Sequence, residues 1–328
     1  MGSNLAIENK EYGRSEFGSR QPVYVLDDPH DLLNQTVVFK ETTQENAYRE
    51  KSNIESFAAY LRRIDAPSWC KLPEPLSIVT REEKAVLVMR RARRIQLGRA
   101  ALQRSASPEI LMAFRRSIRF LAHFHAWRME AEGPRFRNRR VVSKIAQNVL
   151  RLWALSGFKN NITMNDFDVI FRLIDAGFPC IPKKDAHPEN WLLDDENNIV
   201  MLDLESVGEC PLFFELAQLM DDYPVFPVDD CGWDARLEQC AFYIESLAED
   251  GIDFSWNKAD APRLYEAFVL LRASFGLARN QARAGRIPSA ALRASKQRDA
   301  HYRALLDYLG HLPNSAISAL ATKIRACC

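Results

Sequence analysis

The hydrophobic pattern of the chain changes once, close to residue 90, and this change limits the folds open to it. Before it, short runs rich in Val, Ile and Leu, each bounded by turn-forming residues, lie at 22–26, 36–40, 76–79 and 85–89, which predicts strands. After it, apolar residues recur at helical spacing over segments too long for strands. A strand-rich part followed by a helix-rich part predicts an α+β protein.

One helix interrupts the strands of the first part. From 45 to 64 the pattern becomes helical, with Ile54, Phe57, Ala58 and Leu61 on one face. The expected order is therefore two strands, a helix and two strands. Helices are predicted at 108–129, 141–155, 164–176 and 213–220, with several more after residue 233.

A short hairpin is expected within the helical part, from strands 191–193 and 199–202 around the turn 194–198. The 328 residues are enough for two cores. We therefore predict a bilobal arrangement with a small β-rich lobe at 1–90 and a larger helical lobe at 91–328. Clefts between such lobes commonly bind ligands.

Composition excludes several classes of protein. Hydrophobic residues make up 47% and charged residues 27%, as in ordinary globular proteins. No apolar run is long enough for a membrane helix and no apolar signal segment is found, so we expect a cytoplasmic protein without membrane association. The seven cysteines show no C-x-x-C spacing, which argues against a zinc site or a disulfide framework.

The residues most informative about chemistry lie around the predicted hairpin. Asp185 is followed five residues later by Asn190, and Asp203 follows the second strand. Phosphoryl transfer needs a carboxylate to orient the acceptor hydroxyl and oxygen ligands for Mg²⁺, which neutralises the phosphates. The spacing is that of a kinase catalytic loop. The sequence therefore predicts Asp185 as the catalytic base, with Asn190 and Asp203 as metal ligands.

This segment resembles the aminoglycoside phosphotransferase and choline kinase family, which has a protein-kinase-like fold. Family members carry H-G-D-x-H-P-x-N-x-L-x-D and then an apolar strand ending in I-D; Asp185, His187, Asn190 and Asp203 are in register with it. Lys183 and Lys184 stand where the family has His and Gly. The resemblance implies that His187 braces the loop, that ATP and Mg²⁺ are the cofactors, and that a small-molecule hydroxyl is the acceptor.

Two further segments resemble the family. Residues 118–125 match a helix that ends in histidine, and we interpret His123 and His125 as packing residues. Residues 214–217 match the family's D-L-A helix, with Glu215 in place of the Asp.

The β-rich lobe should supply a lysine for the phosphates and a helix glutamate that holds it. Lys40 ends a predicted strand and suits the first role. For the second we prefer Glu55, in the middle of the predicted helix, to Glu50, which lies nearer its start and could serve the helix dipole instead.

The remaining nucleotide contacts are assigned to loops. Residues 13–20 imitate a P-loop but lack its lysine; they better suit a looser loop over the phosphates, with Ser15 and Ser19 as donors. Met89 and Arg90 end the last strand before the helical lobe and are expected to form the hinge whose backbone binds adenine.

Charge distribution bears on the acceptor. Residues 203–260 contain fifteen carboxylates against two basic residues, although the net charge of the chain is only +1. An acidic wall would favour a cationic acceptor, either aminoglycoside-like or an amino alcohol, and Asp229 and Asp230, in a predicted Pro-bounded loop, are its first candidates. Arginines also cluster, at 90–94 and 135–140, but the small net charge argues against a nucleic-acid binder.

Three interpretations of the function stay open at this point. They are a small-molecule kinase, a kinase or effector directed at proteins, and a catalytically silent kinase-like binding module. Retention of Lys40, Asp185 and the two metal ligands favours an enzyme. The sequence does not settle the acceptor, the choice between ATP and GTP, or the oligomeric state.

Overall fold

The computed structural model describes residues 23–26, 37–81, 84–90, 95–104, 107–133, 138–156, 162–174, 180–182, 185–204, 209–252, 260–283, 289–313 and 315–327. The chain divides into two units. One comprises Met1–Ile95 and Leu192–Glu205, and the other comprises Gln96–Trp191 and Ser206–Cys328. Residues 192–205, which the sequence pattern assigns to the helical part, thus group with the N-terminal residues. The roles assigned to 1–90 and 91–328 stay predictions.

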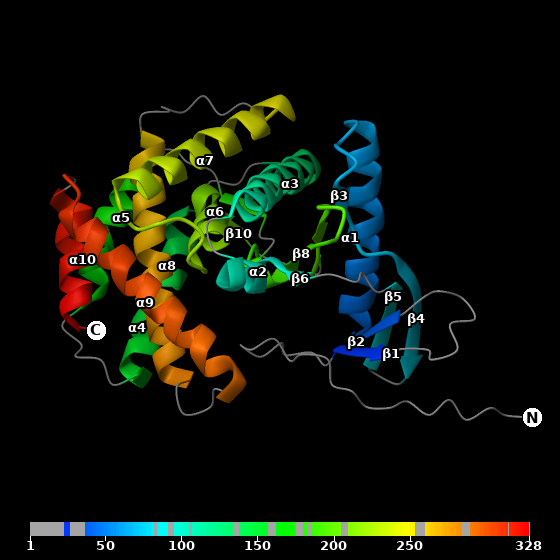
Figure 1. Ribbon diagram of the computed structural model, residues 1–328, viewed down its shortest axis with the longest axis horizontal. Helices are drawn as coiled ribbons and strands as arrows, with labels where there is room; N and C mark the ends of the chain where they lie inside the picture. Colours follow the sequence, from blue (N-terminus) through cyan, green and yellow to red (C-terminus); the bar gives the residue numbers. More distant parts are fainter. Residues whose placement is uncertain are drawn as a thin grey trace, which may run out of the picture. The chain divides into compact units, whose positions relative to one another are not determined.

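A four-stranded antiparallel sheet forms the centre of the first unit (Figure 1). Its strand order is β1-β2-β5-β4, and the four strands predicted before residue 90 are confirmed, with β1 paired to β2 and β4 paired to β5. Lys40 on β2 lies opposite Leu87 on β5. The strands are β1 (Val23–Leu26), β2 (Val37–Thr43), β4 (Pro75–Arg81) and β5 (Lys84–Arg90).

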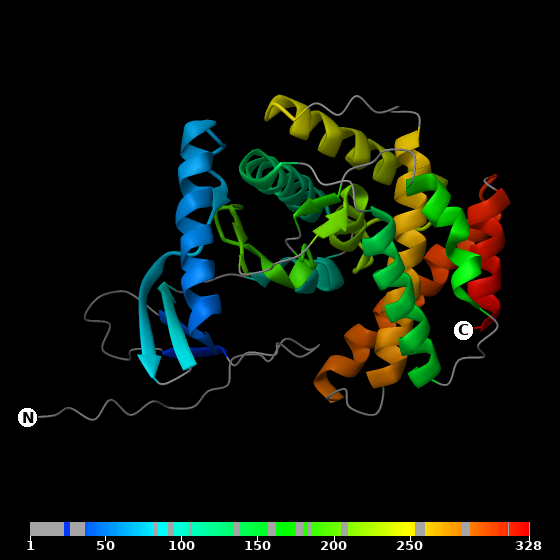
Figure 2. The same cartoon turned by 180° about the vertical axis from the view of Figure 1, so that it is seen from behind.

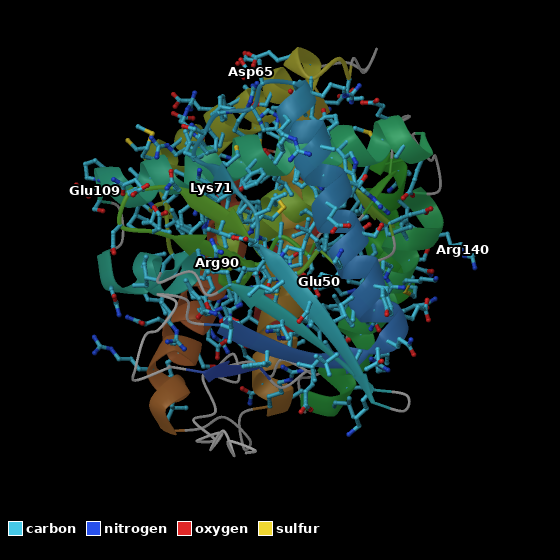
Figure 3. The ribbon with its side chains drawn as sticks, turned by 90° about the vertical axis from the view of Figure 1, so that its right-hand side faces the viewer. Glu50, Asp65, Lys71, Arg90, Glu109 and Arg140 are labelled. Carbon is cyan, nitrogen blue, oxygen red and sulfur yellow. The ribbon has the colours of Figure 1, made fainter. Side chains whose placement is uncertain are left out.

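Helix α1 (Gln44–Arg63) packs against this sheet. Thr43 ends β2 and caps the helix, because its side-chain oxygen accepts the backbone N–H of Asn46 at 3.2 Å. The buried face of α1 carries Ala47, which joins a small core with Leu87 and Met89 of β5. Figure 3 shows α1 beside the strands, with Glu50 labelled on it.

A second sheet carries the end of the motif segment. Its order is β3-β9-β8-β6, from β3 (Cys70–Lys71), β6 (Ile95–Gln96), β8 (Trp191–Leu193) and β9 (Ile199–Met201). The predicted turn between β8 and β9 is confirmed: the backbone N–H groups of Glu196 and Asn198 both donate to the carboxylate of Asp194. Parallel pairing of β9 with β3 links residues 192–205 to the N-terminal unit.

The second unit is mainly helical (Figure 2). Helices α3 and α8 are buried on nearly all sides along much of their length, as expected of helices at the centre of a core. The helices are α2 (Leu97–Arg104), α3 (Pro108–Glu132), α4 (Asn138–Ser156), α5 (Asp168–Ile174), α6 (Leu212–Asp221), α7 (Asp230–Glu249), α8 (Ala261–Arg283), α9 (Ser289–His311) and α10 (Ser315–Cys327).

Short elements complete the second unit. Strands β7 (Cys180–Pro182) and β10 (Glu209–Pro211) form an antiparallel pair. The helix predicted at 164–176 is a 3₁₀ turn, η1 (Met164–Phe167), followed by α5, and a second such turn, η2 (Pro188–Asn190), precedes β8. The fold class is therefore α+β, with a small sheet-containing N-terminal part and a larger helical C-terminal part, as predicted.

Candidate active site

In the N-terminal unit, Lys40 is held by two carboxylates. Its Nζ lies 2.8 Å from Oε2 of Glu50 and 2.9 Å from Oδ1 of Asp203. The lysine side chain is 11% exposed and that of Glu50 is 1% exposed, while Asp203 is 29% exposed. Water therefore reaches this cluster from the side of Asp203.

The prediction that Glu55 pairs with Lys40 is wrong. Glu55 is 57% exposed and forms an ion pair with Lys51 on its own helix, whereas Glu50 reaches Lys40. The cause is the phase of α1: Glu50 lies three residues after Ala47 and four before Ile54, both of which are buried against the sheet. Glu55 lies on another face of the same helix.

Asp203 lies two residues beyond the end of β9 in a left-handed conformation, with φ of 58°. This conformation is rare for residues with a side chain, and Asn and Asp tolerate it best. The segment is tied to the N-terminal unit twice: Asn53 Nδ2 on α1 donates to the carbonyl of Leu204 at 2.7 Å, and Lys40 on β2 contacts Asp203. One contact to α1 and one to β2 fix the direction in which the Asp203 carboxylate points.

In the helical unit, the loop from Asp185 to Asn190 closes on itself. The side-chain amide of Asn190 donates to the backbone carbonyl of Asp185 at 2.9 Å. This contact uses the amide nitrogen, so the amide oxygen is the atom with which Asn190 can coordinate a cation. Asp185 also has a positive φ, 67°. Trp191 Nε1 donates to the carbonyl of Ala186, which anchors the loop to the buried start of β8.

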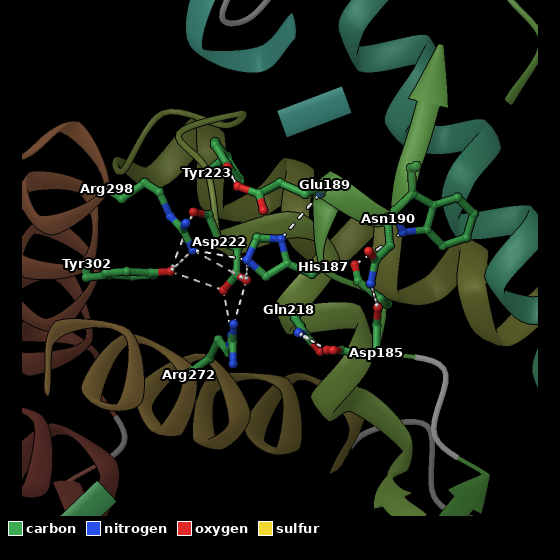
Figure 4. A network of polar contacts seen from close by, with 12 residues as sticks. Asp185, His187, Glu189, Asn190, Gln218, Asp222, Tyr223, Arg272, Arg298 and Tyr302 are labelled. Carbon is green, nitrogen blue, oxygen red and sulfur yellow. Dashed lines mark hydrogen bonds and ion pairs between the residues drawn. The ribbon is translucent and has the colours of Figure 1, made fainter. Parts of the chain in front are cut away.

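Helix α6 and the two residues after it hold this loop along its length (Figure 4). Oε1 of Glu215 accepts the backbone N–H of Asp185 at 2.5 Å, and Nε2 of Gln218 donates to Oδ1 of Asp185 at 2.7 Å. Further on, the hydroxyl of Tyr223 donates to Oε1 of Glu189 at 2.6 Å. Positions 215 and 218 share a helix face, which lets one helix contact both the backbone and the side chain of Asp185.

His187 braces the loop, as the sequence predicts. Its Nδ1 accepts the backbone N–H of Glu189, which assigns the ring proton to Nε2, 3.3 Å from Oδ2 of Asp222. Burial lowers the pKa of His187 from 6.5 to about 4, against the opposing charges of Asp222 and Glu189. The ring is therefore neutral near pH 7.

Asp222 is a fully buried carboxylate surrounded by cations and hydroxyls. Arg272 contacts it with Nε and Nη2, both at 2.5 Å, and the Tyr302 hydroxyl donates to it at 3.1 Å. Burial alone would raise the pKa of Asp222, but the charges of Arg272 and Arg298 and the hydrogen bonds from Arg272 hold that pKa well below its ordinary value. Residues from α8 and α9 are thereby connected to the loop through a single ionised group.

His125 takes part in a buried hydrogen-bond network that its sequence pattern does not reveal. The interpretation of His125 as a packing residue omits its contacts: Nε2 lies 2.8 Å from Oε2 of Glu215, and Nδ1 lies 2.6 Å from the hydroxyl of Tyr243. Both His125 and Glu215 are fully buried. A signal was present, because a glutamate among apolar residues of a mostly apolar helix needs a buried partner. His123 likewise contacts Asp250, at 2.6 Å.

Other sequence-predicted residues fall outside the site or outside the described residues. The backbone N–H of Arg90 donates to the carbonyl of Glu74, and the Met89 side chain packs in the core with Ala47 of α1. The role of their backbone as the hinge that binds adenine stays a prediction. Residues 91–94, which follow this strand, lie outside the described residues, as do Ser15, Ser19, Lys183, Lys184 and Glu205.

A family model described as the phosphotransferase enzyme family matches residues 17–250, which include every site residue named above except Ser15 and the residues of α8 and α9. The chain belongs to this family. No curated protein matches the phosphotransferase in sequence.

Solved structures resemble the phosphotransferase at low sequence identity. A GDP complex of a mutant aminoglycoside 2'-phosphotransferase-IIIa shares 13% identity with a TM-score of 0.50, covering 90% of this chain and 93% of that one. An aminoglycoside-3'-phosphotransferase of type VIII shares 17% identity with a TM-score of 0.44, over 75% and 88% of the two chains. Glucosamine kinase in complex with glucosamine, ADP and inorganic phosphate shares 13%, with a TM-score of 0.37, over 93% and 76%.

The acidic segment of the phosphotransferase is used largely for structure. Asp229 is not in a free loop but caps α7, accepting the backbone N–H of Gly232 at 2.8 Å, and Asp230 is the first residue of that helix and accepts the Tyr308 hydroxyl. The predicted Pro-bounded loop position is therefore wrong for Asp230. Asp221 is buried against Arg236. These carboxylates stabilise the helical unit.

The described residues of the chain contain neither a cluster of metal-ligating side chains nor a membrane-spanning helix. No group of three or more His, Cys, Asp and Glu side chains there is placed to hold a metal ion. None of the described helices combines the length and the apolar character that a membrane crossing requires.

Proposed function

We propose that the phosphotransferase transfers the γ-phosphate of ATP to a hydroxyl group of a small molecule. Asp185 orients the acceptor hydroxyl and takes its proton as the bond to phosphorus forms and the bond to the ADP oxygen breaks. Lys40 binds the α- and β-phosphates, and Glu50 holds Lys40 in place. ADP and the phosphorylated alcohol leave as products.

Magnesium fits the donor set offered by the chain. Asn190 presents an amide oxygen and Asp203 a carboxylate, and hard oxygen ligands are those that Mg²⁺ prefers. When bound, the ion would neutralise charge on the phosphates. Lys40 contacts Asp203, so the lysine that would bind the phosphates lies beside the carboxylate that would hold the metal.

The observation that carries the proposal is the position of Lys40 between Glu50 and Asp203. Removing three charges from much of their water costs free energy that such clusters recover only in part. A binding module without nucleotide chemistry would gain stability from apolar residues at these positions. Retention of all three charges therefore supports a nucleotide-handling enzyme over a silent module.

The decisive experiment incubates the protein with Mg·ATP and a panel of hydroxyl compounds, including aminoglycosides, amino sugars, amino alcohols, neutral sugars and sugar phosphates. Mass spectrometry would detect a gain of one phosphoryl group, with Asp185→Asn as the control. GTP in place of ATP tests the nucleotide. Phosphorylation of a protein substrate and of no small molecule would favour the protein-directed alternative. If neither kind of substrate is phosphorylated and Mg·nucleotide does not bind, the proposal is overturned.

A narrower proposal concerns the acceptor, which we expect to carry an amine. The excess of thirteen negative charges in residues 203–260 supports it, because such a field concentrates cations. Because Asp229 caps α7 and Asp230 accepts the Tyr308 hydroxyl, we do not propose them as ligands of the acceptor amine. Salt should raise the KM of a cationic acceptor, since the Debye length is about 10 Å at 0.1 M. A neutral or anionic acceptor with a salt-independent KM would end this narrower proposal alone.

A further inference from the structure

Gln218 is the buried polar residue of α6 that contacts the Asp185 side chain. Its side chain is 3% exposed, and its Nε2 donates to Oδ1 of Asp185 at 2.7 Å (Figure 4). A hydrogen bond from an amide to a carboxylate is charge-assisted and directional. Gln218 therefore fixes where one oxygen of this carboxylate lies.

The carbonyl oxygen of the Gln218 carboxamide, Oε1, lowers the stability of the fold. Among the described residues, Oε1 of Gln218 is buried and has no hydrogen-bond partner. A buried acceptor without a partner costs about 1–3 kcal/mol, similar to what a hydrogen bond to a charged group contributes. A methionine would fill the same space without this cost. The net stability of the fold therefore gives little reason for a glutamine at this position.

Three of the hydrogen bonds to Asp185 have separate effects. Glu215 holds its backbone N–H and Asn190 its backbone carbonyl, so these two fix the peptide in its left-handed conformation. Neither acts on the side-chain torsions. The contact from Gln218 acts on the carboxylate itself and selects its rotamer.

We propose that Gln218 is a positioning residue, which holds the Asp185 carboxylate in the rotamer that meets the acceptor hydroxyl. The inference rests on the proposed function, because it assigns Gln218 to the residue that orients the acceptor. A displacement of about 1 Å in such a group lowers the rate by about a hundredfold. Nucleotide binding is separate from this carboxylate and should not depend on Gln218.

Gln218→Met tests the inference, with Mg·ATP and two acceptors as probes: water, read as ADP release, and the hydroxyl compound found in the panel. We expect kcat to fall about ten- to a hundredfold, with unchanged KM for ATP and an unchanged thermal shift with Mg·ATP. Gln239→Met is the matched control, because Gln239 is also a buried glutamine but lies on α7. It should retain wild-type turnover.

The same substitution in an Asp185→Asn background separates positioning from general damage. If Gln218 acts through the Asp185 carboxylate, Gln218→Met lowers the residual rate no further. An equal fall in both backgrounds, or an equal fall in Gln239→Met, would overturn the inference.

A crystal structure of Gln218→Met gives a test without activity. We expect the Asp185 carboxylate to move or to occupy more than one rotamer. An unmoved, single-rotamer carboxylate would refute the inference. This readout stands even if the wild-type protein transfers no phosphate to any acceptor, a result that would count against the proposed function instead.

Discussion

The carboxylate of Glu215 accepts the backbone N–H of Asp185 at 2.5 Å and at the same time contacts His125 at 2.8 Å. One buried acid thus joins helix α3, helix α6 and the loop with the proposed base. His125, Glu215 and the Asp185 amide are buried or partly buried. A substitution at His125 or Glu215 should therefore disturb the position of Asp185 through the contact from Glu215.

Replacing the acid tests this connection. Glu215→Ala leaves His125 and the Asp185 amide without their shared partner, and removing one member of a buried charged pair costs about 3–5 kcal/mol. We expect a loss of that order in the free energy of unfolding, measured in urea, together with lower turnover. Glu238→Ala, on α7, should change neither, and an unaffected Glu215→Ala would show that the contact is dispensable.

Asp185→Asn should separate binding from chemistry. The amide keeps the shape of the side chain but accepts no proton, so turnover should fall by about two orders of magnitude or more. Affinity for Mg·ATP, measured by calorimetry, should stay close to that of the wild type. Near-wild-type turnover would show that Asp185 is not the base.

The two candidate glutamates of α1 offer a direct comparison. Glu50→Gln removes the charge that holds Lys40, so we expect the KM for ATP to rise about tenfold or more, equal to about 1.4 kcal/mol. Glu55→Gln changes an exposed partner of Lys51 and should leave the KM unchanged. A larger effect from Glu55→Gln would overturn the assignment drawn from the structure.

Mg·ATP should raise the thermal stability of the protein, because a ligand that binds the native state stabilises it by mass action. At a concentration of one hundred times Kd the gain is about 2.7 kcal/mol. Asp203→Asn should remove the part of the shift that depends on Mg²⁺ and leave the part seen with ATP alone. The absence of any shift in the wild type would remove the basis of the kinase interpretation.

Acid should destabilise the protein below neutral pH through His301. Burial lowers the pKa of His301 from 6.5 to about 4, although Asp221 and Asp222 oppose this and Arg236 and Arg298 add to it. Between these two values the unfolded chain binds more protons than the native one. The free energy of unfolding is therefore unaffected by His301 titration above pH 6.5, and it falls as the pH decreases from 6.5 towards 4.

Urea unfolding at a series of pH values measures this dependence. His301→Gln should reduce the slope of the curve between pH 6.5 and 4 and leave the part due to His187, whose pKa is lowered in the same way. The same change at the exposed His311 should leave the slope as in the wild type. An identical slope in His301→Gln and the wild type would contradict the assignment.

Sequence patterns predicted what depends on local periodicity. The hairpins 23–43 and 75–90, helix α1 and the turn at 194–198 follow from alternation, helical spacing and turn residues. Spacing alone brought Asp185, Asn190 and Asp203 into one hypothesis. The class α+β followed from the same signals.

Contacts between distant segments were not predictable in this way. Glu50 and Glu55 lie on the same helix, and only its phase against the sheet decides which of them reaches Lys40. The partner of His125 is ninety residues away, and the acids at 229 and 230 have helix-capping and hydroxyl partners that net charge does not reveal. Tertiary packing determines all three partners. The spacing of Glu50 from Ile54 and the place of Glu215 in a mostly apolar helix were partial signals.

The positive φ angles of Asp185 and Asp203 restrict which mutations these two positions can accept. A left-handed backbone is tolerated by Gly, Asn and Asp and costs other residues roughly 1–2 kcal/mol. Glutamate would keep the negative charge, but the left-handed backbone disfavours it at both positions. This cost is separate from any effect of its longer side chain. Aspartate is therefore the only carboxylate residue that these two positions accept without backbone strain. A variant that has lost function at either position should regain it most readily by reversion to Asp.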